Sequence, residues 1–166
     1  MGYQVRAATA ADAEAICRIY NQGIEDRLAT LETELRTPDE RRQWLSARAL
    51  RHPVIVATAE TAGPEPIAWA SLNVFNAREC YRFVADISVY VERAWRGKGA
   101  GRVLLDRLVE LGRAHGFHKL VLSAFPFNPG GMALYTRTGF RTVGIYKEQG
   151  QLDGRWVDTI VMERLL

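Results

Sequence analysis

The chain contains few of the residues that build disulfide frameworks or metal centres. Its two cysteines, Cys17 and Cys80, lie far apart and in no metal-type spacing, so we expect free thiols in a reducing compartment. His115 and His118 flank the end of a predicted helix, with no carboxylate nearby. A metal centre needs several such side chains together, and we therefore expect no metal.

The chain also lacks the signals of membrane and secreted proteins. No apolar run approaches the ~20 residues of a membrane span, and the first residues have no basic region followed by an uninterrupted apolar stretch. The excess of 22 Lys and Arg over 19 Asp and Glu would suit an anionic ligand as readily as a nucleic acid. No basic stripe is interleaved with aromatic residues, so we expect no binding to nucleic acid. Because the sequence shows neither a membrane span nor a secretion signal, we expect a cytoplasmic protein that binds no membrane.

The remaining composition is that of an ordinary globule. The chain has 166 residues, of which 48% are hydrophobic and 25% charged, enough for one domain with a substantial core. No repeat, low-complexity tract or linker divides it. We therefore expect a single domain over residues 1–166.

Helix-capping patterns predict two helices in the first third of the chain. Residues 9–12 offer a Thr cap followed by Asp, ahead of apolar residues at helical spacing. Residues 37–40 place Thr at the cap, Pro at the first helical position and Glu where it completes a capping box. We expect the second helix to turn Trp44, Leu45 and Ala47 toward the core.

Apolar and β-branched runs predict strands, which are mixed with two further helices. The expected strands are Tyr3–Ala8, Val54–Ala59, Ile67–Asn73, Val84–Val91, Lys119–Ala124, Thr142–Tyr146 and Trp156–Glu163. The further helices run from the glycines near residue 99 to about His115, and over Gly130–Thr138. This mixture predicts an α/β (α+β) fold.

The segment from Arg96 to Arg102 has glycine at every second position, between a predicted strand and a predicted helix. Glycines let a ligand approach the backbone, and the unpaired N–H groups of a helix N-terminus suit a phosphate. The pattern therefore predicts a diphosphate site with extra charge from Arg96, Lys98 and Arg102; a glycine-rich turn without a ligand is the alternative. It fits neither a Rossmann fingerprint nor a Walker loop, because the third glycine comes too early and no Ser or Thr follows Lys98.

Two motifs in this order resemble the GCN5-related N-acetyltransferase (GNAT) superfamily. They are Arg96-x-x-Gly99-x-Gly101 and, about 25 residues on, Asn128, Ala133-Leu134-Tyr135 and Gly139-Phe140. The resemblance implies acetyl-CoA as co-substrate and a mixed, mostly antiparallel sheet, splayed at the coenzyme site and flanked by about four helices. It also implies the following coenzyme-binding residues: Val89, Tyr90, Val91, Arg96, Gly97, Lys98, Gly99, Ala100, Gly101 and Asn128.

Further segments narrow the resemblance to the phosphinothricin, methionine sulfoximine and arsinothricin N-acetyltransferases. They are Ile19-Tyr20-Asn21, Ala29 to Thr33, Arg78-x-x-Tyr81, Ser88 to Val91 and Asp153 to Asp158. This group implies acetyl transfer to the α-amine of a small glutamate-like antimetabolite, which detoxifies herbicides and antibiotics, and it implies a homodimer. The alternatives are an acetyltransferase for a protein N-terminus or lysine, and a non-catalytic module that binds acetyl-CoA.

The resemblance also assigns roles to single residues. Asp86 stands where the family has a glutamate general base, but its side chain is one methylene shorter, which favours a bridging water; it could instead cap or pair at the start of a strand. Tyr135 would protonate the leaving thiolate, or it is a packed helix aromatic. Asn128 would bind coenzyme, cap a helix, or do both.

The resemblance places acceptor recognition in a loop before the strand that carries Asp86. Arg78 is the principal candidate, because a guanidinium fork matches carboxylate and phosphinate oxygens; a solvated surface charge is the alternative. Tyr81 and Asn76 share its loop, and Asn76 stands where a relative has a basic residue. Thr30, from the loop between the first two helices, is a further candidate.

Overall fold

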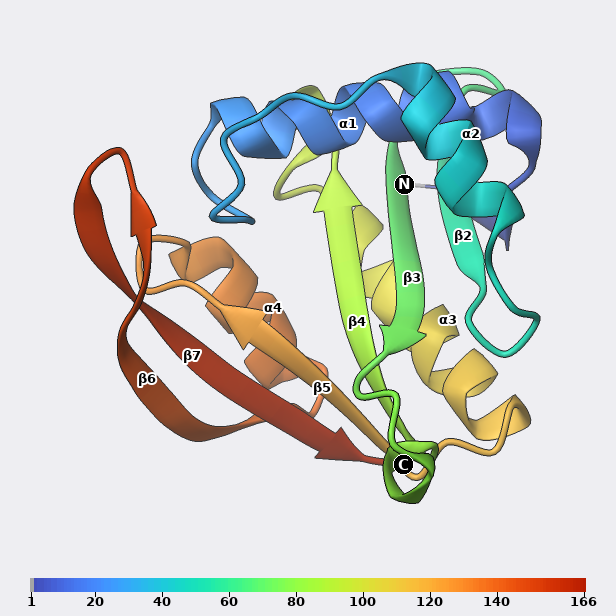
Figure 1. The fold of residues 1–166 in the computed structure, drawn as a ribbon. Coiled ribbons are helices and arrows are strands. Elements are labelled where there is room, and N and C mark those ends of the chain that lie inside the picture. The colour runs from blue at the N-terminus through green and yellow to red at the C-terminus, as the bar shows by residue number, and fades with distance from the viewer. Residues whose placement is uncertain (1) are drawn as a thin grey trace.

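The computed structural model describes residues 2–166, which form a seven-stranded sheet with helices on both faces (Figure 1). The strands are β1 Tyr3–Ala7, β2 Val54–Ala59, β3 Ala68–Val74, β4 Val84–Val91, β5 Lys119–Ala124, β6 Arg141–Leu152 and β7 Arg155–Leu165. Their order across the sheet is β1-β2-β3-β4-β5-β7-β6. Only the β4–β5 pair is parallel, so the expected mixed, mostly antiparallel sheet is confirmed.

Four α-helices cover the sheet. They are α1 Ala13–Glu25, α2 Pro38–Ser46, α3 Ala100–Ala114 and α4 Pro129–Arg137. Helices α1 and α2 lie over one face, where a small core gathers around Trp69 (Figure 1). Helix α3 lies against the other face over the larger core, which includes Leu104 and Leu108, and α4 packs on the same core through Leu134. None of the helices in residues 2–166 is long and apolar enough to cross a membrane.

The predicted capping signals lie where the helices begin. The Thr37 hydroxyl accepts a hydrogen bond from Glu40 N at 3.2 Å, and the Asp12 carboxylate accepts one from Thr9 N at 2.8 Å. One expected core position in α2 is wrong, because Ala47 is exposed. The buried side chain of this helix is Arg41, whose charge concealed it from a hydrophobic pattern.

The last two strands are longer than the sequence predicted. They form a hairpin that closes through Asp153 and Gly154, both with positive φ (51° and 77°). Most of β6 is exposed, so it lacks the alternation of apolar and polar residues on which the strand prediction depended.

The central feature is the separation of β4 from β5. Pairing between them covers only Val84 to Asp86 of β4 against Lys119 to Val121 of β5. Beyond Asp86 the strands diverge and leave a V-shaped opening in the middle of the sheet (Figure 1). This is the splay that the resemblance implied.

Candidate active site

The glycine loop forms the N-terminus of α3. Gly99 is the N-cap residue with a φ of +94°, and Gly97 has a φ of +75°, a conformation that side chains disfavour. No side chain caps this helix end. A Cβ at Gly101 would lie 2.8 Å from Leu134 Cδ2, so α3 and α4 approach closely here. Uncapped N–H groups beside this close contact fit a diphosphate.

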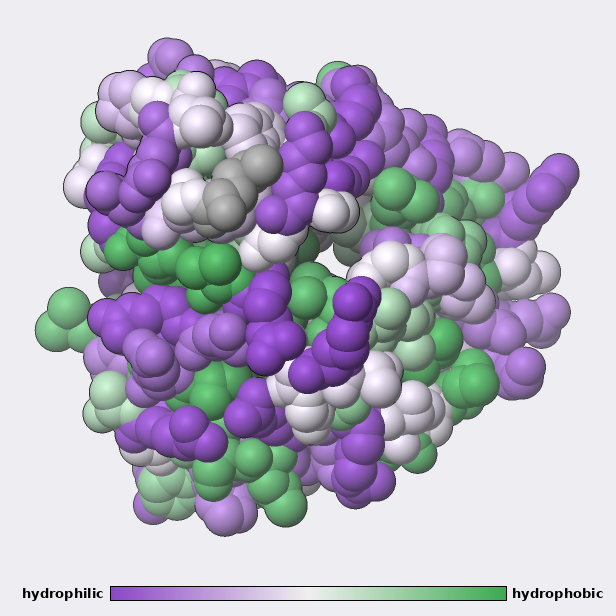
Figure 2. Space-filling model, turned by 180° about the vertical axis from the view of Figure 1, so that it is seen from behind, coloured by the Kyte–Doolittle hydropathy of each residue, from purple (hydrophilic) through white to green (hydrophobic). Residues whose placement is uncertain are grey.

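These glycines line a cavity of about 540 Å³ that runs along β4. Its walls include Val89, Tyr90 and Val91 of β4, together with Arg96, Gly97, Gly99, Ala100, Gly101 and Asn128. The opening on the face that carries α3 has both polar and apolar residues at its rim (Figure 2). Nine of the ten residues expected at the coenzyme thus surround one space.

The cations of the glycine loop differ in what they contact. Arg96 is bound to Asp26 at 2.6 Å and therefore ties the loop to α1. Lys98 is the expected residue that does not line the cavity; its ammonium lies 5.3 Å from the centre of the Trp95 ring. Arg102 does line the cavity, and its guanidinium is paired with Asp106 at 3.2 Å.

Asn128 combines the two roles that the sequence left open. Its side chain caps α4 by accepting a hydrogen bond from Gly131 N at 3.0 Å, and its amide also reaches Leu28 O at 3.4 Å. The same residue lines the coenzyme cavity and a smaller one beside it. The cap therefore fixes a polar side chain at the boundary between two spaces.

The smaller cavity, of about 260 Å³, contains both predicted catalytic residues. Asp86 reaches it from β4 and Tyr135 from α4, across the gap between β4 and β5. Burial raises the pKa of Asp86 to about 6, although the Asn73 amide, 3.4 Å away, acts in the opposite direction. Burial, and then the charge of Asp86, raise the pKa of Tyr135 to about 12. At neutral pH this chamber holds one ionised acid and one protonated phenol.

A polar chain that sequence reasoning did not find orients Asp86. Arg48, between α2 and β2, donates to Asn73 Oδ1 at 2.9 Å and to the Leu72 carbonyl. Since the Asn73 oxygen is occupied, its amide N–H groups face Asp86 and Ser88, the latter at 3.1 Å. Burial lowers the pKa of Arg48. The Asn73 side chain is thereby fixed with a donor toward the carboxylate.

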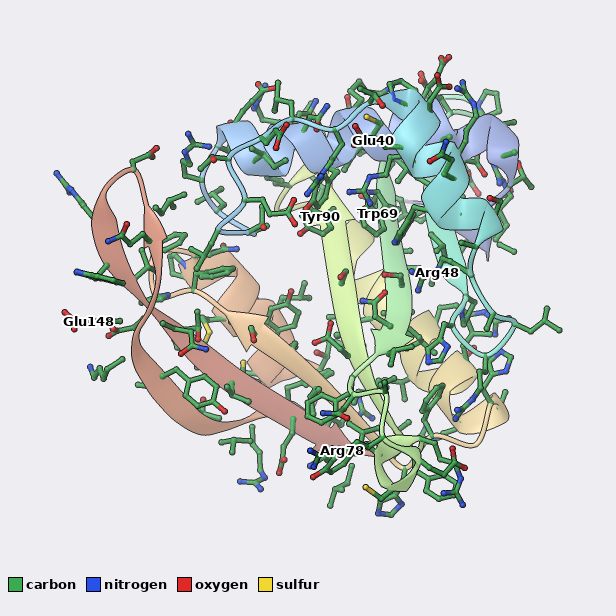
Figure 3. All side chains as sticks on the ribbon, viewed as in Figure 1. Glu40, Arg48, Trp69, Arg78, Tyr90 and Glu148 are labelled. Carbon is green, nitrogen blue, oxygen red and sulfur yellow. The ribbon has the colours of Figure 1, made fainter. Side chains whose placement is uncertain are left out.

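A third cavity, of about 500 Å³, lies between α2 and the sheet. It is lined by Tyr20, Thr30, Glu32, Arg36, Glu40, Arg41, Trp44, Trp69, Asn73, Ser88 and Tyr90. Thr30, Ser88 and Tyr90 also line the chamber that holds Asp86, so the two spaces adjoin. The Tyr90 side chain lies on this acceptor side, stacked on Trp69 with ring centres 4.9 Å apart (Figure 3).

Of the four predicted acceptor residues, only Thr30 lines these cavities. Asn76, Arg78 and Tyr81 line none of the three. Arg78 lies at the opposite end of the sheet from Trp69 and Tyr90 (Figure 3). In this loop Asn76 accepts a hydrogen bond from Arg78 N at 2.9 Å, and Tyr81 packs against Phe75.

Residues 2–166 contain no cluster of metal-ligating side chains and no disulfide. Within residues 2–166 no group of three or more His, Cys, Asp or Glu side chains could hold a metal ion. Cys17 is a buried free thiol and Cys80 an exposed one. The reacting groups offered by these residues are therefore a carboxylate, a phenol and backbone amides.

Comparison with known proteins agrees with this arrangement. Residues 14–140 match the acetyltransferase (GNAT) family. The L-methionine sulfoximine/L-methionine sulfone acetyltransferase of Pseudomonas paraeruginosa is 34% identical, over 98% of this chain and 94% of that protein.

Two solved structures are similar over nearly the whole chain. The phosphinothricin acetyltransferase of Sinorhizobium meliloti, in complex with acetyl-CoA, has a TM-score of 0.92 at 33% identity and covers 100% of this chain and 89% of its own. The ribosomal-protein-alanine N-acetyltransferase of Brucella melitensis has a TM-score of 0.92 at 36% identity and covers 98% of this chain and 99% of its own. The chain belongs to the GNAT family and is an N-acetyltransferase that uses acetyl-CoA.

Proposed function

We propose that this enzyme acetylates the α-amine of a small, acidic, amino-acid-like antimetabolite of the phosphinothricin or methionine sulfoximine type. The observation that carries the proposal is the junction of three spaces. An acceptor cavity and a coenzyme cavity meet at a chamber that holds Asp86 and Tyr135. The names of its relatives, which act on such amino acids, support the same acceptor class.

Asp86 acts as the general base. An α-amine is mostly protonated at neutral pH and must lose a proton before it can attack a thioester. A carboxylate with a pKa of about 6 is ionised at that pH and is still basic enough to accept the proton. Because the side chain is short, the proton passes through a water between the amine and the carboxylate.

Tyr135 acts as the general acid. As the amine nitrogen bonds to the acetyl carbon and the carbon–sulfur bond breaks, the phenol gives its proton to the departing sulfur. A phenol with a pKa of about 12 is fully protonated beforehand. In water a free thiol has a lower pKa than a phenol. Burial in the same chamber also raises the pKa of the coenzyme A thiol and so brings it closer to the pKa of Tyr135.

The chain binds acetyl-CoA along β4 and at α3. We assign the diphosphate to the N-terminal amides of α3, with Gly97, Gly99, Ala100 and Gly101 leaving room for it. Val89, Tyr90 and Val91 present backbone groups to the pantetheine arm, and Asn128 holds it near the acetyl group. Arg96 fixes the loop through Asp26, and Lys98 adds charge at its outer side.

The loop before β4 contacts the acceptor near its α-carboxylate. It begins just after Asn73, the residue paired with Asp86, and so it lies at the Asp86 end of the site. Arg78 binds the carboxylate there, with Asn76 and Tyr81 as neighbours, and Thr30 closes the opposite wall. Replacing Arg78 with Ala should raise KM for the amino acid and leave KM for acetyl-CoA unchanged; equal effects on both would exclude this role.

The proposed active unit is a homodimer of single-domain subunits in the cytoplasm. Strand β6 is an edge of the sheet and exposes Val143, Ile145 and Tyr146, which are 51%, 53% and 56% accessible. Edge strands with exposed apolar residues are prone to associate. The exposed thiol of Cys80 fits a reducing compartment. Light scattering of the purified chain would distinguish a dimer from a monomer.

The proposed function is tested by coenzyme A release in the presence of phosphinothricin, methionine sulfoximine, arsinothricin, glutamate and a short alanine-terminated peptide. Fast turnover of an antimetabolite with little on glutamate would support the proposal. The peptide represents the second candidate function, which the name of the Brucella relative favours. A peptide that outperforms the amino acids would overturn the proposal; we expect the reverse, because an acceptor cavity of about 500 Å³ has the size of a small-molecule site.

A further inference from the structure

Arg41 is a buried cation that forms no ion pair within residues 2–166, although the Glu32 carboxylate is close enough to interact with its charge. It is 9% exposed, and its guanidinium lies 4.1 Å from the centre of the Tyr20 ring and 4.9 Å from that of Trp44. Within residues 2–166 its side chain makes no ion pair and no hydrogen bond. Aromatic faces stabilise a cation, but they leave its N–H donors unused, and a buried charge with unused donors is costly.

Trp69 lines the same cavity as Arg41, but its own donor is enclosed by the protein. Trp69 is 2% exposed, and its Nε1 is the one fully buried side-chain nitrogen or oxygen without a hydrogen-bond partner in residues 2–166. The Arg41 nitrogens also lack protein partners and yet are not fully enclosed. They must therefore meet open space, and the space that both residues line is the acceptor cavity.

The carboxylates around this cavity do not use these donors. Glu32 accepts hydrogen bonds from the Tyr20 hydroxyl at 2.6 Å and from Arg36 at 2.7 Å. Glu40 lies 4.0 Å from Arg36. The charged lining residues (Glu32, Arg36, Glu40 and Arg41) sum to zero, so attraction at long range is weak. What remains is a local surplus of donors beside Arg41, which suits an acidic group that enters the cavity.

The position of Arg41 indicates which acidic group it would bind. Asp86, Ser88 and Tyr90 alternate on the cavity face of β4, so the first and last are roughly 13 Å apart along the strand. Arg41 lies near the Tyr90 end of this row, because the Tyr20 ring contacts both residues, with its centre 4.1 Å from the Arg41 guanidinium and 5.0 Å from the Tyr90 ring. An amine held near Asp86 through water is too far from Arg41 for its own α-carboxylate to reach it. The acidic group at the end of the acceptor side chain can reach it.

We propose that Arg41 binds the side-chain acidic group of the acceptor in the cavity between α2 and the sheet. The ligand class is a carboxylate, phosphinate or arsinate carried on a short amino-acid side chain. This inference rests on the proposed function, because it assumes that the amine lies near Asp86. It makes α2 a determinant of specificity for acidic over neutral side chains.

The test compares Arg41→Gln with Arg42→Gln in the full chain. Arg42 adjoins Arg41 on the same helix but is exposed and paired with Asp39 and Glu14, which makes it a matched control. With phosphinothricin, whose side chain is anionic, Arg41→Gln should raise KM about 10–100-fold, the loss of one charge-assisted interaction. With methionine sulfone, whose side chain is neutral, it should change KM less than about threefold. KM for acetyl-CoA and the kinetics of Arg42→Gln should match the wild type.

An equal rise in KM for both acceptors would overturn the proposal, because a structural role of Arg41 does not depend on acceptor charge. Arg41→Lys provides a milder variant if Arg41→Gln fails to fold. The lysine keeps the charge without the fork and should give an intermediate KM.

Direct binding separates this inference from the proposed function. Phosphinothricin is titrated calorimetrically into wild type, Arg41→Gln and Arg42→Gln without acetyl-CoA. Binding that weakens only in Arg41→Gln would support the inference even if the wild type shows no turnover, in which case the proposed function alone would fail. Absence of binding to the wild type, or equal binding to all three proteins, would overturn it.

Discussion

Replacing Asp86 with Asn should make the folded protein more stable while it removes activity. The carboxylate is buried between β4 and β5, and burial raises its pKa from 3.8 to about 6. The folded state therefore holds this proton more tightly than the unfolded chain does. As pH rises from about 4 to about 6, the unfolded chain gives up the proton first, and the wild type loses stability. Asn is neutral at every pH and avoids that loss.

The size of the effect follows from the two pKa values. The difference between 3.8 and about 6 corresponds to about 3 kcal/mol of unfolding free energy once both states are ionised. The advantage of Asp86→Asn should grow from about 1 kcal/mol at pH 4.5 to about 3 kcal/mol at pH 8. For a chain of this length, the larger value corresponds to roughly 6–12 °C in Tm.

The assay is thermal unfolding of wild type and Asp86→Asn from pH 4.5 to pH 8, together with kcat at pH 8. Glu110→Gln, which removes an exposed carboxylate on α3 that is paired with Arg107, is the control for the loss of one surface charge. A difference in stability between wild type and Asp86→Asn that does not change with pH would refute the argument from burial. Loss of a general base should lower kcat about 100-fold or more; an unchanged kcat would remove Asp86 from the mechanism whatever its effect on stability.

Three other variants test the rest of the site. Asn73→Ala removes the hydrogen bond that lowers the pKa of Asp86, so the acid limb of the kcat/KM profile should move upward by about one pH unit; no movement would exclude this contact. Tyr135→Phe should lower kcat about 10–100-fold while calorimetry shows unchanged acetyl-CoA affinity, and a weakened affinity would instead indicate a packing role. Gly101→Val places a branched side chain against Leu134 inside the coenzyme cavity and should raise KM for acetyl-CoA at least about tenfold. Acetyl-CoA kinetics like the wild type would contradict the assigned diphosphate site.

Local rules were enough to predict most of the helices and strands and a glycine loop suited to a diphosphate. The caps at Thr9 and Thr37 and the glycines at 97 and 99 act through backbone geometry within a few residues, and geometry at that range is encoded locally. Asp86 was proposed because it stands where the resembling family has its general base, and because a carboxylate is unusual in an apolar strand. Its pKa of about 6 could not be read from the sequence, because it depends on α4 and β3 closing around it.

The acceptor cavity was not predicted, because its residues become a site only through long-range packing. Arg41 precedes Trp44 by three residues and so shares its helix face. That spacing was the available signal, but charged helix residues usually face water. The Arg41 guanidinium packs on Tyr20, which comes from α1 and belongs to the small core around Trp69. Arg48 and Asn73 likewise meet only because β3 lies beside the segment that leads into β2.

The short pairing of β4 with β5 has a consequence for the life of the protein in a cell. From Ile87 to Val91, β4 pairs with β3 but leaves the side that faces β5 open, although it lies in the middle of the sheet. Open strand edges invite association with other chains. A bound pantetheine arm would occupy that edge as a removable strand. Any ligand that binds only the folded state also stabilises it in proportion to its concentration. The supply of acetyl-CoA would then govern how much of this enzyme remains folded and dispersed, as well as how fast it works.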